Sequence, residues 1–243
     1  MKLHLFPQRT PDWFAARESC VITASELGPF VYKDDATSKK ARLNHIAKKL
    51  AEPIYRDSTL SGFEFLMKIR EKEDKAMEYN LPVQRGNALE AEARELYGKI
   101  TGRPLIEVGF ITTDCGRFGC SPDSLVLSRM LTEDDGEATI IKCVERGLEI
   151  KCPIPETHIK WLLAGELPDD HRCQVHGSMA ITGLHRWDFM SYCPGLPPLI
   201  VTAERVTLTD DLEKGMNTLY AEYCKHGSKV RDLWNAQMKS TAA

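Results

Sequence analysis

The sequence predicts a mixed α/β fold in which a central mixed β-sheet is flanked by helices. The first observation is order: helix-favouring segments come first, then a β-rich centre with embedded helices, then a closing helix. The second is size, because 243 residues with 42% hydrophobic side chains suffice for one domain with a substantial core. We expect a single domain over 1–243, with an N-terminal helical region (about 10–103), a β-rich core (about 104–206) and a C-terminal helix (about 209–239).

The N-terminal region is expected to contain three helices. Segment 38–49 has five basic side chains and no acidic one, and Ser38 is a candidate N-cap. This helix is either a solvated face or a surface that contacts phosphates. Its apolar residues at helical spacing are Leu43, Ile46, Ala47 and Leu50. Dense charge with interspersed apolar residues predicts a second helix over 63–79. A third, over 85–100, ends before Gly102 and Pro104.

The centre of the chain alternates between strand-like and helix-like segments. Strands are expected at 106–113, 117–128, twice within 139–153, and at 187–193 and 199–206. The acidic, turn-like segment 132–138 indicates a surface hairpin. Helices are expected at 156–164 and 169–182, separated by Gly165 and Pro168, and a long helix closes the chain, with Gly227 as a possible kink.

Bulk composition excludes several classes of protein. No apolar run approaches the roughly 18 residues that span a bilayer, and the N-terminus lacks a signal-peptide core, so we expect a cytoplasmic protein without a membrane partner. Eight dispersed cysteines without a C-x-x-C pair favour reduced thiols over disulfides or zinc ligands. The net charge of −3 does not by itself favour nucleic acid, because DNA-binding domains are often basic.

Two short segments carry candidate chemistry. One contains Ser121, Pro122 and Asp123; the other contains Glu149, Ile150 and Lys151 in a strand-like context. Residues two apart on a strand point to the same face, so Glu149 and Lys151 can enter one cleft. Carboxylates with a backbone carbonyl suit Mg²⁺ or Mn²⁺, and a lysine can orient or deprotonate the attacking water. This order of residues is the Asp…Glu-x-Lys signature of PD-(D/E)XK nucleases.

The surrounding residues resemble the lambda-type alkaline exonucleases, a viral recombinase nuclease family with a PD-(D/E)XK core. The matching stretches are residues 13–17 with 21–25, 85–94, 120–125 with 147–153, and 174–179. They occur in the family's order and extend over residues 13–179. His176 departs from the family pattern, because it stands where the second Gln of the Q-V-Q motif is expected.

The resemblance implies a role for each matched residue. Asp123, Glu149 and the Ile150 carbonyl would bind metal, two Mg²⁺ ions being expected with Mn²⁺ as a substitute, and Glu90 would reach the metal directly or through water. Lys151 would act on the attacking water, and Gln174 would position it or Lys151. The pocket for a 5′-terminal phosphate would consist of Arg17, Ser25 and Ser121. Candidates for an apolar wedge that separates the strands are Leu81 and Val83.

The resemblance also implies a substrate and an assembly. It indicates a 5′→3′ exonuclease that degrades linear duplex DNA from 5′-phosphate ends and leaves 3′ overhangs for recombination. A homotrimeric ring, a single-strand annealing partner and a bacterial or phage-infected cytoplasm belong to the same expectation. With the net charge of −3, this predicts a surface that is basic along 39–49 and near Arg17, and acidic elsewhere.

Two alternatives remain open at the level of sequence. One is a different PD-(D/E)XK enzyme, such as a restriction or repair endonuclease. The other is a catalytically silent scaffold that binds DNA ends, against which the intact Asp123, Glu149 and Lys151 argue. A small-molecule hydrolase is disfavoured, because the chain lacks a G-x-S-x-G elbow, a P-loop and a dinucleotide-binding glycine motif.

Overall fold

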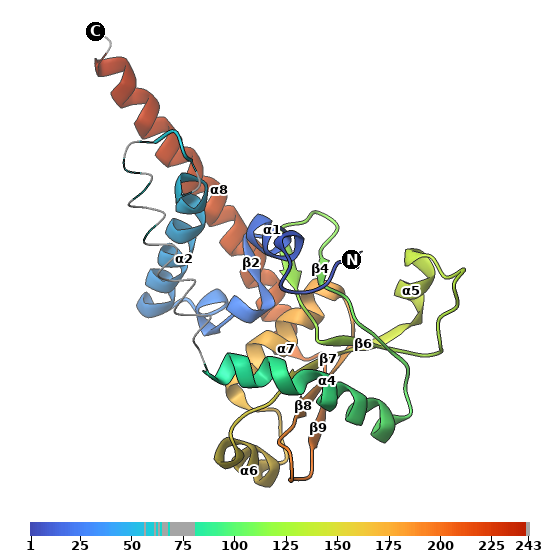
Figure 1. The fold of residues 1–243 in the computed structure, drawn as a ribbon. Coiled ribbons are helices and arrows are strands. Elements are labelled where there is room, and N and C mark those ends of the chain that lie inside the picture. The colour runs from blue at the N-terminus through green and yellow to red at the C-terminus, as the bar shows by residue number, and fades with distance from the viewer. Residues whose placement is uncertain (56, 61, 63, 65–67, 69–80, 242–243) are drawn as a thin grey trace. The chain divides into compact units, whose positions relative to one another are not determined.

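The computed structural model describes residues 1–55, 57–60, 62, 64, 68 and 81–241. The predicted helix over 63–79 therefore lies almost entirely outside the described residues. The chain divides into two compact units (Figure 1). The first comprises Met1–Gly28 with Ala76–Glu213, and the second comprises Pro29–Lys75 with Lys214–Ala243. The single domain expected over 1–243 stays a prediction.

The first unit contains two mixed sheets. A four-stranded sheet has the order β1-β4-β5-β2, from Lys2–His4, Phe110–Thr112, Phe118–Cys120 and Ile22–Thr23. A five-stranded sheet has the order β3-β6-β7-β8-β9, from Leu105–Ile106, Ser124–Leu127, Val144–Lys151, Arg186–Ser191 and Leu199–Glu204. Each sheet has one parallel pair, β2–β5 or β7–β8, among antiparallel ones. The predicted α/β class is confirmed, with its strands divided between two sheets.

The chain passes between the sheets within segments that were predicted as single strands. The predicted strand over 117–128 is β5 in one sheet and β6 in the other, with Ser121, Pro122 and Asp123 between them. Proline lacks the N–H that a central strand needs, so pairing stops at Pro122. The predicted strand over 106–113 divides in the same way into β3 and β4. Asp123 thus lies at a crossing between the two sheets.

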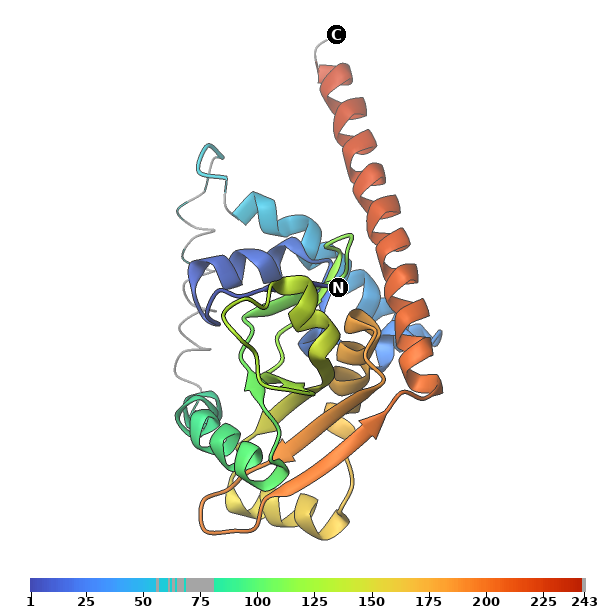
Figure 2. The same ribbon diagram turned by 90° about the vertical axis from the view of Figure 1, so that its right-hand side faces the viewer.

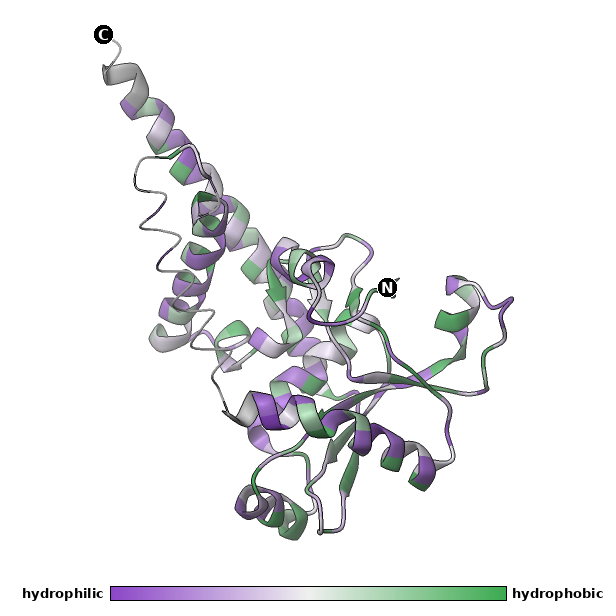
Figure 3. Ribbon diagram, in the orientation of Figure 1, coloured by the Kyte–Doolittle hydropathy of each residue, from purple (hydrophilic) through white to green (hydrophobic). Residues whose placement is uncertain are grey.

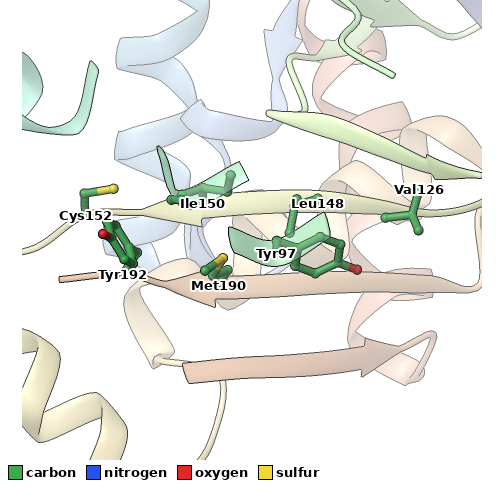
Figure 4. Packing of buried hydrophobic residues seen from close by; sticks show 8 residues of the cluster. Tyr97, Val126, Leu148, Ile150, Cys152, Met190 and Tyr192 are labelled. Atoms are coloured by element: carbon green, nitrogen blue, oxygen red, sulfur yellow. The ribbon is translucent and has the colours of Figure 1, made fainter. Parts of the chain in front are cut away.

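Two helices cover opposite faces of the five-stranded sheet. Helix α4, Leu81–Thr101, packs on the face that carries Leu148 and Ile150, where a buried apolar cluster forms (Figure 4). Helix α7, Asp169–Thr182, lies on the face toward which Glu149 points. Helix α6, Pro155–Ala164, and α7 together connect the parallel strands β7 and β8.

The helix predictions for this region agree closely with the structure. Helices α6 and α7 end at glycines with φ of 67° and 77°, a left-handed conformation that glycine adopts without strain. Helix α1, Pro11–Ser19, begins after Thr10, whose hydroxyl accepts a hydrogen bond from the Trp13 N–H. A short 3₁₀ helix, η1 at Ala24–Glu26, follows β2.

The strand expected at the beginning of 139–153 is wrong. Residues Glu137–Cys143 form helix α5, and the strand β7 starts only at Val144. Ile140 and Cys143 are buried three residues apart, which places them on one helical face. The Glu137 carboxylate accepts a hydrogen bond from the Leu3 N–H and so attaches α5 to β1. Burial of one helical face outweighs the strand preference of Thr139 and Ile140.

The second unit contains helix α2, Ala36–Tyr55, the 3₁₀ helix η2, Pro29–Val31, and the part of α8 that begins at Lys214. Helix α8 spans Thr207–Thr241 without interruption at Gly227 (Figure 2), where Leu50 of α2 leaves little room for a side chain. Hydrophilic and hydrophobic residues alternate along α8 (Figure 3).

The buried face of α2 differs from the predicted one. Its buried residues are Ser38, Arg42, Ile46 and Lys49, whereas Leu43 is half exposed. Arg42 donates to the carbonyls of Phe30 and Lys33 at 2.8 and 2.7 Å, so its charge stabilises the fold of this unit. Asp35, not Ser38, caps the helix, because its carboxylate accepts the Ser38 N–H at 2.8 Å. These contacts weaken the prediction of a continuous basic surface along 39–49.

The helices give no sign of a membrane segment. Among the described residues, no helix combines the length and the apolar character needed to cross a bilayer.

Candidate active site

Asp123 lies at the edge where strand β6 begins. Its backbone N–H donates to the Leu148 carbonyl at 3.0 Å, and its carboxylate accepts a hydrogen bond from the Ile150 N–H. Arg94 of α4 donates to the Asp123 carbonyl at 3.2 Å and to the Ser124 hydroxyl at 3.0 Å. The aspartate is therefore fixed to β7 on one side and to α4 on the other.

Glu149 and Lys151 extend from β7 on the face toward α7, as the strand alternation predicts. Glu149 is 3% exposed, and its carboxylate accepts hydrogen bonds from Lys151 Nζ and, at 2.6 Å, from Gln174 Nε2. Glu149 is thus held by one charged and one neutral donor. The structure confirms that Glu149 and Lys151 share a face, and it brings Gln174, which the resemblance assigned to the same site, into contact with Glu149.

The backbone of Ile150 lies between these side chains. The N–H and C=O of one residue point to the same edge of a strand. Because the Ile150 N–H points toward Asp123, its carbonyl is directed to the same side, where β6 no longer pairs with β7. The carbonyl predicted as a metal ligand is therefore on the correct edge of the strand.

Glu90 approaches from α4 but is engaged by arginines. Arg94 donates to one carboxylate oxygen at 2.6 Å, and Arg9 donates to the other at 3.1 Å. Among the described residues, no group of three or more His, Cys, Asp or Glu side chains is arranged to hold a metal ion. The predicted set differs from such a group: it has two carboxylates and a backbone carbonyl, with Glu90 bound to arginines.

The types of donor nevertheless suit a hard cation. Burial, followed by the nearby Glu149, raises the pKa of Asp123 well above its usual value. Burial lowers the pKa of Lys151, but Glu149 and Asp123 outweigh it, and the net pKa is raised. Buried carboxylates that repel each other are stabilised by a cation bound among their oxygens.

A cavity of about 450 Å³ opens beside these groups. Its walls include Glu90, Asp123, Ile150, Lys151, Arg9 and Trp161. Glu149 is not among the residues that line this cavity, and its buried carboxylate is held by Lys151 and Gln174. The cavity therefore presents Glu90, Asp123 and Lys151 to a substrate.

A second cluster forms around the Arg17 guanidinium. Arg17 donates to the Ser25 hydroxyl at 2.9 Å and contacts the Ser121 hydroxyl at 3.5 Å. Burial lowers the pKa of Arg17, although the guanidinium remains a cation at neutral pH. The structure thus brings together all three residues predicted to form the phosphate pocket. Only Pro122 separates Ser121 from Asp123 in the chain.

Two further residues complete this cluster, and the sequence assigned them no role. The Trp13 ring lies under Arg17 at 4.7 Å, and its indole N–H donates to Ser121 at 2.9 Å. The Thr23 hydroxyl accepts from Arg17 at 3.4 Å. Both residues lie in the stretches on which the family resemblance is based, and that resemblance is the sequence signal that could have identified them.

The remaining predicted residues have different outcomes. Leu81 and Val83 lie at the start of α4, and their side chains are outside the part of the chain that the structure describes. His176 is buried, and its Nδ1 shares a hydrogen bond of 2.9 Å with the Thr209 hydroxyl. His176, which departs from the family motif, therefore has a hydrogen-bond partner in this structure. Arg94, which contacts Glu90, ends the matched stretch 85–94 but was given no role, whereas Arg9 had no signal that distinguished it from other arginines.

Comparison with known families agrees with this arrangement. The YqaJ-like viral recombinase domain matches residues 12–185, which contain every predicted site residue. The chain belongs to this family. No curated protein matches the sequence.

Solved structures support the family assignment. The YqaJ-like chain is similar to an alkaline exonuclease, LHK-Exo, from Laribacter hongkongensis, with 27% identity and a TM-score of 0.67 over 94% of this chain and 100% of that one. The complex of LHK-Exo with dAMP matches with a TM-score of 0.68, at the same identity and coverage. A phage-related exonuclease from Haemophilus somnus 129PT, at 14% identity, shares the fold with a TM-score of 0.52 over 86% of this chain and 95% of that one. These findings identify a nuclease.

Proposed function

We propose that this protein is a metal-dependent 5′→3′ exonuclease that hydrolyses phosphodiester bonds from the 5′ ends of linear duplex DNA. Its products would be 3′ overhangs for recombination or strand annealing. The main support for the proposal is that the segment 121–123 connects the Arg17 cluster to the carboxylate cluster. Ser121 belongs to the Arg17 cluster, and Asp123 belongs to the carboxylate cluster. One strand end could then contact both at once.

The carboxylate cluster fits the hydrolytic half of this reaction. Asp123, Glu149 and the Ile150 carbonyl would hold Mg²⁺, with Mn²⁺ as a substitute and two ions expected. A bound metal supplies Lewis-acid stabilisation of the phosphate and a more acidic water. Lys151 would orient the attacking water and stabilise charge on the phosphate, and Gln174, which donates to Glu149, would keep that carboxylate in position.

The Arg17 cluster suits recognition of a DNA end that carries a 5′-phosphate. An arginine fork with two hydroxyl groups suits a terminal phosphate dianion. Trp13 stacks on the guanidinium and restricts its orientation. Each cleavage that leaves a 5′-phosphate on the remaining strand would recreate the group that Arg17 holds. The complex of the relative LHK-Exo with dAMP is consistent with a nucleotide site in this fold.

Digestion of defined duplexes tests the polarity and the requirement for a 5′-phosphate. Linear duplexes with 5′-phosphate or 5′-hydroxyl ends, and closed circles, are incubated with and without Mg²⁺. We expect 5′ mononucleotides and a 3′ overhang from phosphorylated linear DNA only, and no reaction without metal. Cutting of closed circles would instead indicate an endonuclease. DNA binding without hydrolysis in any metal would indicate a silent scaffold.

Substitution of Lys151 tests the active-site assignment. Lys151→Ala should reduce the hydrolysis rate by at least about 10³-fold while DNA binding remains, because the group that acts on the water is lost. Lys142→Ala, an exposed lysine of α5, is the matched control and should retain normal turnover. Unchanged turnover of Lys151→Ala would contradict the assignment.

A further inference from the structure

Arg9 has an unusual backbone conformation for its residue type. Its φ is 65°, and it is the one non-glycine with positive φ among the described residues. The left-handed region is unfavourable for residues with a β-carbon, and such strain persists only where the surroundings impose it. Residues with such strained backbones are concentrated at active sites and ligand-binding sites.

The segment around Arg9 is fixed on both sides. Gln8 donates to the Pro122 carbonyl at 2.9 Å, so the segment is bound directly beside Asp123. The Thr10 hydroxyl donates to the Pro7 carbonyl at 2.8 Å and accepts from Trp13 at the start of α1. Hydrogen bonds thus hold the backbone on both sides of Arg9, one of them to the residue that precedes Asp123.

This conformation places the Arg9 guanidinium at the catalytic cavity. Arg9, Glu90 and Asp123 belong to the walls of both the 450 Å³ cavity and a neighbouring cavity of about 360 Å³. The guanidinium contacts Glu90 at 3.1 Å, yet the side chain remains 49% exposed. A half-exposed ion pair contributes little stability, so this pair alone does not account for the strained backbone.

Charge indicates what Arg9 could bind. Arg9 and Lys151 are the cationic residues among those that line the larger cavity, and Lys151 is already paired with Glu149. A phosphodiester strand that enters a cavity lined by the carboxylates of Glu90 and Asp123 needs a cation beside them. Arg9 has donors that remain free for phosphate oxygens, because one nitrogen serves Glu90.

We propose that Arg9 binds a backbone phosphate of the strand being hydrolysed, next to Asp123. The inference rests on the proposed nuclease function, and it adds a substrate-binding residue to it. Arg9 is distinct from the Arg17 cluster, which would hold the terminal phosphate.

Salt dependence of DNA binding gives the most direct test. Binding of a phosphorylated duplex is measured without metal in the Lys151→Ala background, with and without Arg9→Gln. Loss of one phosphate contact should reduce the slope of log affinity against log salt concentration by about 0.7–0.9. In the Lys151-containing enzyme, Arg9→Gln should lower kcat/KM at least tenfold, and Arg9→Lys should restore part of it.

Arg103→Gln is the matched control. Arg103 is 44% exposed and pairs with Glu145 at 3.2 Å, as Arg9 pairs with Glu90, but lies outside both cavities. This control should leave the slope and kcat/KM unchanged. If Arg9→Gln behaves like Arg103→Gln, the Arg9 proposal is wrong. If the unsubstituted protein neither binds nor hydrolyses DNA, the proposed function itself fails.

A second pair of variants separates binding from folding. Arg9→Gly and Arg9→Ala both remove the guanidinium, but glycine adopts a φ of 65° without strain. We expect equal losses of kcat/KM, with a melting temperature a few degrees higher for Arg9→Gly. If activity instead follows melting temperature across the pair, the role of Arg9 is structural and the proposal is overturned.

Discussion

At the scale of single residues, the Arg17 guanidinium combines several weak contacts into one pocket. Its partners are a tryptophan face and three hydroxyl groups, none of which is negatively charged. Arg17 is half-buried, and its burial lowers its pKa although the nearby Glu26 carboxylate acts in the opposite direction. A phosphate would supply the missing negative charge.

Substitution of Arg17 should therefore change selectivity for the end of the DNA. For Arg17→Gln we expect the preference for 5′-phosphate over 5′-hydroxyl ends to fall to about one, because the charged donor is lost. The initial rates on the two duplexes, measured side by side, give this ratio. A variant that loses activity on both ends but keeps the original ratio would show that Arg17 has another role.

The surroundings of His171 predict that the stability of the protein depends on pH. Its ring stacks on Phe189 at 5.4 Å and meets Trp161 edge-on at 5.3 Å. Burial, and then the charge of Lys151, lowers its pKa to about 4. The folded protein therefore keeps the ring neutral, whereas the unfolded chain binds a proton below about pH 6.5. Stability is complete above this pH and is lost as the pH falls toward 4.

Urea denaturation at pH 7.5 and pH 5 measures this effect. The wild-type protein should lose roughly 1–2 kcal/mol more than His171→Phe between these values, after allowance for partial solvent screening. Phenylalanine keeps the stacking but does not titrate. Equal losses in the two proteins would show that His171 does not cause the dependence.

At the scale of elements, strand β7 carries the two candidate catalytic residues Glu149 and Lys151, and it packs closely at Gly147. A β-carbon at Gly147 would lie 2.4 Å from the ring of Trp187, which is completely buried on β8. The absence of a side chain thus allows the indole to pack directly on β7, two residues before Glu149.

Gly147→Ala should destabilise the protein by about 1–3 kcal/mol, because the Trp187 ring must move in a filled core. Gly98→Ala in α4 is the control, since its β-carbon would meet only Leu105, at 3.8 Å, and alanine favours a helix. Thermal or urea denaturation of both variants checks this. Equal stability of Gly147→Ala and the wild type would mean that the sheet adapts without cost.

At the scale of the whole molecule, the net charge of −3 includes the carboxylates of Asp123 and Glu149 in the candidate site. The buried charges of the described residues cancel, because Arg42 and Lys49 are buried as well as Glu149 and Asp188. A cation bound by Asp123 and Glu149 would offset part of the negative total where the protein would meet DNA.

The resemblance to ring-forming nucleases predicts the mass of the protein in solution. Three chains of 27.4 kDa give about 82 kDa, since a closed ring needs a fixed number of identical interfaces. Light scattering during size-exclusion chromatography measures this directly. A mass of one chain at the concentration used for the activity assay would contradict the predicted trimer.

The sequence by itself determined the residues of the candidate site and most of the elements that carry them. The spacing of Glu149 and Lys151 predicts that their side chains lie on the same face of the sheet. This follows from the pleat of a strand and does not depend on the rest of the fold. Helices α6 and α7 were similarly predictable, because Gly165 and Gly183 end them through local backbone geometry. Such features depend on interactions between neighbours in the chain.

Only the tertiary structure decided how distant segments meet. It divided the strands between two sheets, made 137–143 a helix and buried Arg42 against backbone carbonyls. It also placed Arg9 beside Glu90, 81 positions away in the sequence. These outcomes depend on burial and on hydrogen bonds between segments, whose energies outweigh local preference and leave no periodic pattern in the sequence.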